Sequence, residues 1–178
     1  MTGVITRFGV LGVFLLMVPE SACIPIPSEV TLLFSGFAVH QGWMGFPAAV
    51  AAATAGNLVG SLLGYALGAT RVLERIPGAS GVLQRSERLL ERHGSRAVLI
   101  ARLLPLARTF VSLPAGARRI PLPGFVAMTL AGCAIWAAAF TATGMIAGTA
   151  WTTVSTTIGR IALVTAGIVL VTLLVKRP

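Results

Sequence analysis

Two glutamates interrupt the apolar N-terminal part of the chain. Glu20 and Glu29 lie in VPESACIPIPSEVTLLFSGF, residues 18–37, with Pro25 and Pro27 between them. An ionised side chain inside hydrocarbon costs at least about 2.5–3.5 kcal/mol, so such residues face the protein interior or a water-filled cavity. A carboxyl group held away from bulk water keeps its proton more readily and can serve as a proton carrier. The pattern therefore predicts proton-coupling residues at Glu20 and Glu29.

Two arginines repeat this arrangement in the second half of the chain. Arg102 and Arg108 flank Pro105 in AVLIARLLPLARTFVSLPAGARRIPLPGF, residues 97–125. Two guanidinium groups can grip a phosphate through paired hydrogen bonds, which predicts phosphate binding by these arginines. Beside protonatable carboxylates, such a site suits proton-coupled movement of a phosphorylated lipid. A salt-bridge network that only holds the structure together is the alternative, although buried ion pairs stabilise poorly compared with apolar packing.

Enzyme chemistry, a metal site, a cofactor and nucleic-acid binding have little support in the sequence. There is no Ser/His/Asp or Cys/His set, metal-binding motif or phosphate loop, and Cys23 and Cys133 lie in apolar surroundings without a partner motif. The net charge is +9, but six of the thirteen arginines lie within residues 71–96. Short basic loops beside membrane segments set topology, so we attribute the charge to orientation in a membrane.

Composition predicts an all-α integral membrane protein. Of the 178 residues, 56% are hydrophobic and only 11% are charged, and the mean hydropathy is +0.89. Soluble domains carry about 25% charged residues. Several apolar runs approach or exceed the roughly 18–20 residues that a spanning helix needs.

We expect a single membrane domain, residues 1–178, with two re-entrant helical hairpins of opposite orientation and about three transmembrane helices. The expected parts are hairpin 1 at 3–43, a span at 47–70, a basic amphipathic cytoplasmic segment at 71–96, hairpin 2 at 97–119, and spans at 123–149 and 157–175. The hairpins are predicted because each holds two short apolar pieces joined at a proline-rich turn, and broken backbone at membrane depth must be covered by protein or water. The basic loop and the basic C-terminus are both expected in the cytoplasm. The hairpins then enter from opposite sides, as in inverted-repeat transporters.

Small residues mark one face of the first predicted span. Gly56, Gly60, Gly64 and Gly68 recur at intervals of four, a spacing that allows close helix packing. Polar residues run beside them. The predicted cavity-lining residues are Asn57, Ser61, Tyr65 and Thr109, and the predicted hairpin-turn residues are Pro25, Pro27, Ser28 and Pro105.

These motifs together resemble the DedA family, also called the SNARE-associated or VTT-domain family. The matching residues are Glu20, the run from Pro25 to Glu29, the run from Arg102 to Phe110, Gly116 and Pro121. The glycine-rich segment from Gly60 to Tyr65 and the stretch from Gly132 to Trp136 fit as well. The resemblance covers about residues 8–150 and implies a bacterial inner-membrane protein with opposed re-entrant hairpins, linked to transport of polyprenyl phosphate carriers or phospholipids and to the proton motive force. It also implies that the essential acids are Glu20 and Glu29 and the essential arginines Arg102 and Arg108. Many members have an aspartate where this chain has Ser61, and this chain contains no aspartate.

We therefore expect a flippase of a phosphorylated lipid, with undecaprenyl phosphate the leading substrate and a phospholipid the next. Two other classes stay open: a proton-coupled exporter of small cations or drugs, and a non-transporting membrane scaffold. The arginine pair separates them, because a cation site gains nothing from two nearby cations. The expected partners are the lipid, protons and the membrane, with a homo-oligomer left open. The expected location is the bacterial inner membrane, in multi-pass form with a cytoplasmic C-terminus.

Overall fold

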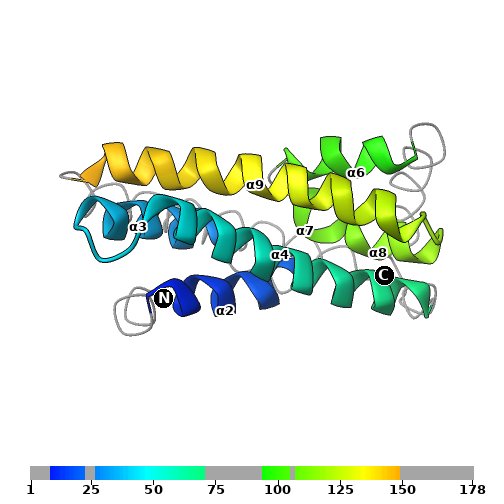
Figure 1. The fold of residues 1–178 in the computed structure, drawn as a ribbon. Helices are drawn as coiled ribbons and strands as arrows, with labels where there is room; N and C mark the ends of the chain where they lie inside the picture. The colour runs from blue at the N-terminus through cyan, green and yellow to red at the C-terminus, as the bar shows by residue number, and fades with distance from the viewer. Residues whose placement is uncertain (1–8, 23–26, 71–93, 105–106, 149–178) are drawn as a thin grey trace, which may run out of the picture.

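Two long antiparallel helices form the centre of the structure, which is a computed structural model describing residues 9–22, 27–70, 94–104 and 107–148. Helix α4, Phe46–Ala69, and helix α9, Leu122–Ile146, pack together and run in opposite directions (Figure 1). Each has a proline in its first turn, where the missing N–H would have no helical partner. At 24 and 25 residues, each is about 36 Å long at 1.5 Å per residue. Within the described residues, they are the two helices long and apolar enough to cross a membrane.

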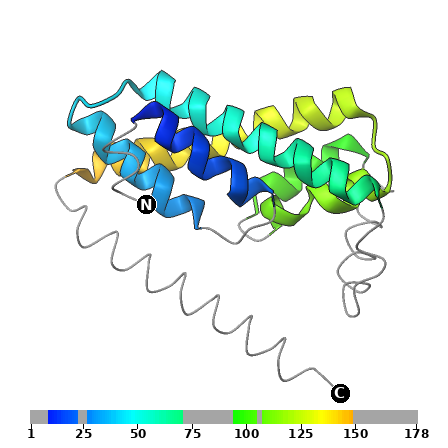
Figure 2. The same ribbon diagram turned by 90° about the horizontal axis from the view of Figure 1, so that it is seen from below.

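Five shorter helices flank this pair in the described part of the chain. Helices α2, Val10–Ser21, and α3, Ser28–His40, lie toward one end, and α6, Ser95–Arg102, α7, Ala107–Phe110, and α8, Ser112–Ala117, lie toward the other (Figures 1 and 2). Helices α2 and α3 have 12 and 13 residues, or about 18–20 Å. That length is well short of the roughly 30 Å hydrocarbon core of a bilayer. The described residues are helices and turns without strands.

Glycines bring α4 close to the short helices on either side of it. Helix α2 packs along the middle of α4, where a Cβ on Gly60 would collide with the carbonyl oxygen of Val18. Helix α8 packs along the end of α4, where a Cβ on Gly68 would collide with the carbonyl of Leu113. The predicted close packing along this glycine stripe is confirmed.

The packing of α3 against α9 repeats that of α8 against α4. A Cβ on Gly144 would collide with the carbonyl of Leu33, as one on Gly68 would with that of Leu113. The reverse contacts also correspond, because Gly36 of α3 lies against the carbonyl of Thr141 and Gly116 of α8 lies against that of Tyr65. Tyr65 of α4 precedes Thr141 of α9 by the same number of residues as Gly68 precedes Gly144. Likewise, Leu33 of α3 precedes Leu113 of α8 by the same number of residues as Gly36 precedes Gly116. The two halves of the chain thus share a common arrangement, in which each long helix packs against one short helix from each half. Helices α2 and α8 pack on α4, whereas α3 and α6 pack on α9.

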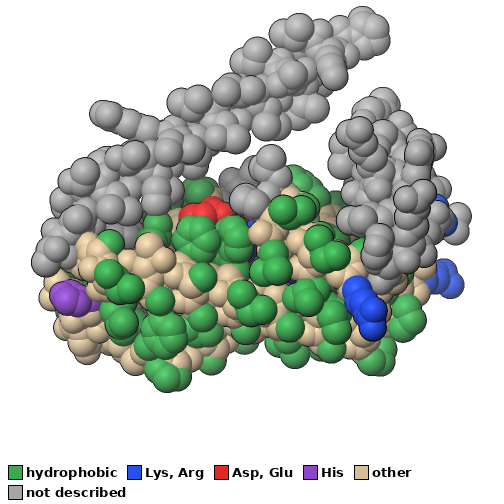
Figure 3. All heavy atoms as spheres, turned by 90° about the horizontal axis from the view of Figure 1, so that it is seen from above, with side chains coloured by type: hydrophobic (Ala, Val, Ile, Leu, Met, Phe, Trp, Pro, Cys, Tyr) green, Lys and Arg blue, Asp and Glu red, His purple; other side chains and the backbone are tan. Residues whose placement is uncertain are grey.

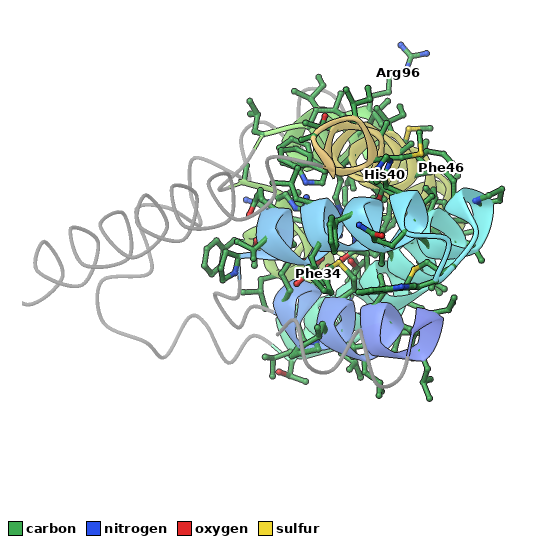
Figure 4. All side chains as sticks on the ribbon, turned by 90° about the vertical axis from the view of Figure 1, so that its left-hand side faces the viewer. Phe34, His40, Phe46 and Arg96 are labelled. Atoms are coloured by element: carbon green, nitrogen blue, oxygen red, sulfur yellow. The ribbon has the colours of Figure 1, made fainter. Side chains whose placement is uncertain are left out.

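Apolar side chains fill the space between the helices and also cover the outside. One buried cluster joins α2, α3, α4 and α9 and includes Phe34, which lies between α3 and α2 in Figure 4. A second joins α6, α8 and α9 around Phe125. Large apolar side chains are also exposed along the long helices, among them Leu63 and Ile135, and Figure 3 shows many apolar side chains spread over one face. Exposed apolar surface of this extent marks an interaction with a membrane or a partner.

Several predicted parts lie outside the described residues. These are residues 71–93 of the predicted cytoplasmic segment, the predicted span at 157–175, and the predicted turn residues Pro25 and Pro105. Helix α4 occupies the predicted span at 47–70, and α9 occupies the one at 123–149 but ends at Ile146. Helix α6 begins at Ser95, so the last two residues of the predicted cytoplasmic segment belong to the first helix of the predicted hairpin 2.

Candidate functional site

Three charged side chains meet inside the described part of the protein. Glu20 lies in the last turn of α2, Arg102 is the last residue of α6, and Arg108 lies in the short helix α7. Their side chains are almost fully buried, with exposed fractions of 2%, 2% and 3%. We call these residues and the neighbouring side chains that contact them the charged cluster.

Glu20 and Arg108 form an ion pair. Arg108 Nη2 lies 3.2 Å from Glu20 Oε1 and 3.3 Å from Oε2, so one guanidinium nitrogen faces both carboxylate oxygens. Thr109 Oγ1 donates a long hydrogen bond of 3.5 Å to Oε1. Removing one partner of such a buried pair would leave the other charge uncompensated, which costs about 3–5 kcal/mol. The pair therefore links the end of α2 to α7 across more than eighty residues of sequence.

Arg102 joins three elements through its planar guanidinium group. Nη1 donates to the backbone carbonyl of Arg108 at 2.6 Å. Nη2 donates to the hydroxyl oxygens of Ser61 on α4 and Ser112 on α8, each at 2.8 Å. A rigid fork with several donors suits this task better than the single ammonium of a lysine. Arg102 thus fixes the position of Arg108 through its backbone.

Polar residues of α2 and α4 extend the charged cluster beside Glu20. The Ser21 hydroxyl lies 2.6 Å from Asn57 Oδ1 and 3.1 Å from Glu20 Oε2. Ser61 donates its own hydroxyl proton to the backbone carbonyl of Asn57, which leaves its lone pairs for Arg102. Asn57 and Ser61 are both fully buried. A hydrogen-bonded chain therefore connects Glu20 to Arg102 through α4.

Trp136 of α9 covers Arg108. The guanidinium carbon of Arg108 lies 4.8 Å from the centre of the indole ring, within the range of a cation–π interaction. The indole also stacks at 4.7 Å on Phe140 one turn later in α9. Among the described residues, neither Trp136 Nε1 nor Arg108 Nη1 has a hydrogen-bond partner, although both atoms are buried.

Glu29 is not part of the charged cluster. It lies in the first turn of α3, is half-buried, and forms no hydrogen bond or ion pair with the other residues that the structure describes. Figure 3 shows an acidic side chain among apolar ones on one face, and Glu20 and Glu29 are the acidic residues in the described ranges. Of the four charged residues that the sequence singled out, the structure thus brings together Glu20, Arg102 and Arg108.

The other predicted positions divide between the charged cluster and its surroundings. Thr109 contacts Glu20 as described above, whereas Tyr65 donates its hydroxyl proton to the backbone carbonyl of Ile120 at 2.7 Å and so fastens the turn before α9. Pro27 precedes the first residue of α3, and Ser28, its first residue, is buried.

Sequence reasoning did not single out three members of the charged cluster. Ser21 directly follows Glu20, and Ser112 lies four residues after Arg108 at the start of α8, so spacing from the charged residues could have indicated both. Trp136 belongs to a different helix, and its contact with Arg108 depends on how α9 packs. Neither its type nor its position in the sequence predicts that contact.

Comparison with known proteins identifies the family. A family model described as the VTT domain matches residues 26–146. The chain is 32% identical over 160 residues to a Lactococcus lactis protein named alkaline phosphatase-like protein, a match covering 83% of this chain and 75% of the relative. It is 28% identical over 155 residues to undecaprenyl phosphate transporter A of Bacillus subtilis, covering 83% and 76%. It is 34% identical over 172 residues to an uncharacterized membrane protein of Mycobacterium tuberculosis, covering 89% and 79%.

No solved structure matches the chain. The family model spans more than half of the sequence and includes α3, α4 and all the helices from α6 to α9. Its match also includes Arg102, Arg108 and Trp136 of the charged cluster, while Glu20 lies before it. The chain belongs to the VTT-domain family of membrane proteins, also called the DedA family.

Proposed function

We propose that this protein moves a phosphorylated lipid across the membrane and that the charged cluster binds its phosphate. The observation that carries the proposal is the composition of the cluster. It holds two buried guanidinium groups and one buried carboxylate, and Arg108 Nη1 has no hydrogen-bond partner among the described residues. Guanidinium groups bind phosphate oxygens with strong, directional hydrogen bonds.

Undecaprenyl phosphate is the substrate we propose first, with a phospholipid second. Two relatives, from Bacillus subtilis and Staphylococcus aureus, are named undecaprenyl phosphate transporter A, each 28% identical to this chain. The name alkaline phosphatase-like protein belongs to the Lactococcus relatives. For this chain we propose binding and movement of the phosphate without enzymatic cleavage, because the arginines and their partners suit recognition of an anion.

We propose that protonation of Glu20 couples proton and phosphate binding. While Glu20 is ionised, its carboxylate occupies Arg108 Nη2. A proton on Glu20 would weaken this pair and free Arg108 for a phosphate oxygen. Proton binding and phosphate binding would then favour each other, as a transporter driven by the proton motive force requires. Glu29, half-buried on the neighbouring helix α3, is the second proton carrier in this scheme.

We propose that α2–α3 and α6–α8 are two re-entrant hairpins of opposite orientation. Their helices are too short to cross a bilayer alone, and each of the long helices α4 and α9 packs against one short helix from each half of the chain. The exposed basic residues Arg96, Arg118 and Arg119 lie at the end formed by α6, α8 and the start of α9. Figure 4 shows Arg96 pointing away from the helices. We assign this end to the cytoplasmic side of the bacterial inner membrane. We place the C-terminus on the same side because Lys176 and Arg177 are basic.

A proton-coupled exporter of small cations is the leading rival. It would use the glutamates for the cation, but the only carboxylate in the charged cluster among the described residues already faces Arg108. A scaffold that transports nothing would need the cluster only for stability.

Reconstitution tests all three classes. Purified protein in vesicles is supplied with labelled undecaprenyl phosphate, with and without a pH gradient. We expect movement of the lipid that increases with the gradient in one direction and that Arg108→Ala abolishes. No movement of undecaprenyl phosphate or of phospholipid under either condition would refute the proposal. Uptake of a small cation in its place would favour the rival.

A further inference from the structure

Two of the buried N–H donors in the charged cluster that lack an acceptor among the described residues belong to groups in contact with each other. They are Arg108 Nη1 on α7 and Trp136 Nε1 on α9. The guanidinium group lies over the indole at 4.8 Å from its centre, so the two donors belong to groups in direct contact. Arg108 already directs its other terminal nitrogen toward Glu20.

Such a pair of donors calls for a common acceptor. Buried polar atoms in proteins nearly always have a hydrogen-bond partner. Leaving one unsatisfied costs about 1–3 kcal/mol. The indole N–H can only donate, so no rotation or change of protonation gives it another role. An acceptor with several oxygens could satisfy both donors at once.

We infer that Trp136 is a phosphate-binding residue, whose Nε1–H donates to an oxygen of the same phosphate that Arg108 binds. This inference rests on the proposed function and adds a binding residue to it. A phosphate monoester presents three terminal oxygens, enough for separate hydrogen bonds to Arg108 and to the indole. A carboxylate has two oxygens in one plane and a sulfonium or ammonium cation has none. A phosphate head therefore suits the two donors better than a carboxylate or a cation does.

Trp136 has two separable contributions in this scheme. Its ring face holds Arg108 through the cation–π contact, and its N–H contacts the ligand. Phenylalanine keeps an aromatic face and its stacking on Phe140, but it has no N–H. The substitution Trp136→Phe therefore removes the ligand contact and preserves most of the packing.

The experiment measures binding of farnesyl phosphate, a short prenyl phosphate, to the purified protein in detergent, with farnesol as the uncharged probe. We expect Trp136→Phe to weaken farnesyl phosphate binding about tenfold, equal to about 1.4 kcal/mol, and to leave farnesol binding unchanged. The matched control is Trp43→Phe. Trp43 also contacts an aromatic ring, edge-on to Phe37 at 5.8 Å, but it is 54% exposed at the turn between α3 and α4. We expect wild-type affinity for that variant.

The outcomes separate the inference from the proposed function. If the wild-type protein binds farnesyl phosphate no better than farnesol, the proposed phosphate site fails and the inference fails with it. If the wild-type protein prefers the phosphate and Trp136→Phe binds it equally well, the inference is overturned and the proposed function stands.

A fluorescence measurement covers the case in which Trp136→Phe does not fold. The chain has three tryptophans, so the double variant Trp43→Phe with Trp151→Phe leaves Trp136 as the single emitter. We expect farnesyl phosphate, but not farnesol, to shift or quench its emission at concentrations that match the binding curve. An unchanged emission spectrum at saturating farnesyl phosphate would overturn the inference.

Discussion

The end of α2 and the start of α3 each carry one glutamate, but the two glutamates have different surroundings. Glu20 is 2% exposed and lies within 3.3 Å of Arg108 through both of its oxygens. Glu29 is half-buried and has no ion pair with another described residue. They look equivalent in the sequence, where both flank the same prolines.

This difference indicates different roles for the two glutamates, whereas the sequence predicted the same proton-coupling role for both. A carboxylate fixed against a buried arginine contributes to folding because it compensates the charge of that arginine. A carboxylate that is partly exposed and has no such partner can exchange protons without disturbing the packing. We therefore expect changes at Glu20 to affect stability and transport together, and changes at Glu29 to affect transport alone.

The largest expected effect comes from Glu20→Gln. The amide keeps the size of the side chain but removes the charge that compensates Arg108, which should destabilise the protein by about 3–5 kcal/mol. Membrane abundance and thermal unfolding in detergent measure this loss. The double variant Glu20→Gln with Arg108→Gln removes both charges and should recover most of the stability. A single variant as stable as wild type would remove the contrast with Glu29.

The charged cluster shows which part of a membrane site can be inferred from residue types. Charges in apolar segments must find partners, so a meeting of acids and bases could be predicted from Glu20, Arg102 and Arg108 alone. Which acid meets which base could not be predicted, because it depends on how α2 and α3 are rotated about their axes. If a helix were displaced by one residue along its sequence, each of its residues would take the environment of its neighbour.

The same reasoning explains what could be predicted of the fold. The helices α4 and α9 follow from long apolar runs with a proline near the start, and these runs fix their positions to within a few residues. The close contact of Gly68 with Leu113 follows from the glycine spacing only in part. The spacing predicts that some backbone approaches α4, but not that it comes from the other half of the chain.

The next largest effect concerns the arginine that positions Arg108. Arg102→Lys keeps the charge but cannot reach Ser61, Ser112 and the Arg108 carbonyl together, which should cost about 1.5–3 kcal/mol for each charged hydrogen bond lost. We expect lower thermal stability and strongly reduced transport, although the charge is unchanged. Arg119→Lys is the matched control, because Arg119 is exposed, and such a change should stay within about 0.5 kcal/mol. Equal behaviour of the two variants would mean that only the charge of Arg102 matters.

A smaller effect is expected when a residue of α4 adds a negative charge to the charged cluster. Ser61 accepts a hydrogen bond from Arg102 at 2.8 Å, so Ser61→Asp would place a carboxylate beside that guanidinium group. The protein should fold, and its affinity for farnesyl phosphate should fall about tenfold, or about 1.4 kcal/mol, because the added charge repels the phosphate. Ser61→Asn has the same size without the charge and should bind more tightly than the aspartate variant. Equal affinity in the two variants would contradict a phosphate site at this position.

The smallest effect on stability, and the sharpest test of the contrast, is expected for Glu29→Gln. The amide replaces a half-buried carboxyl group that has no ion pair with another described residue, so no charge is left uncompensated. The free energy of unfolding should change by no more than about 0.5 kcal/mol, and the membrane abundance should equal that of wild type. Transport should nevertheless lose its response to a pH gradient, because the amide cannot take up or release a proton. Vesicles with and without the gradient, compared at equal protein content, measure this. A Glu29→Gln variant that is stable and still responds to the gradient would leave Glu20 as the single proton carrier. A variant as unstable as Glu20→Gln would show that Glu29 also compensates a buried charge, and the two glutamates would then share one role.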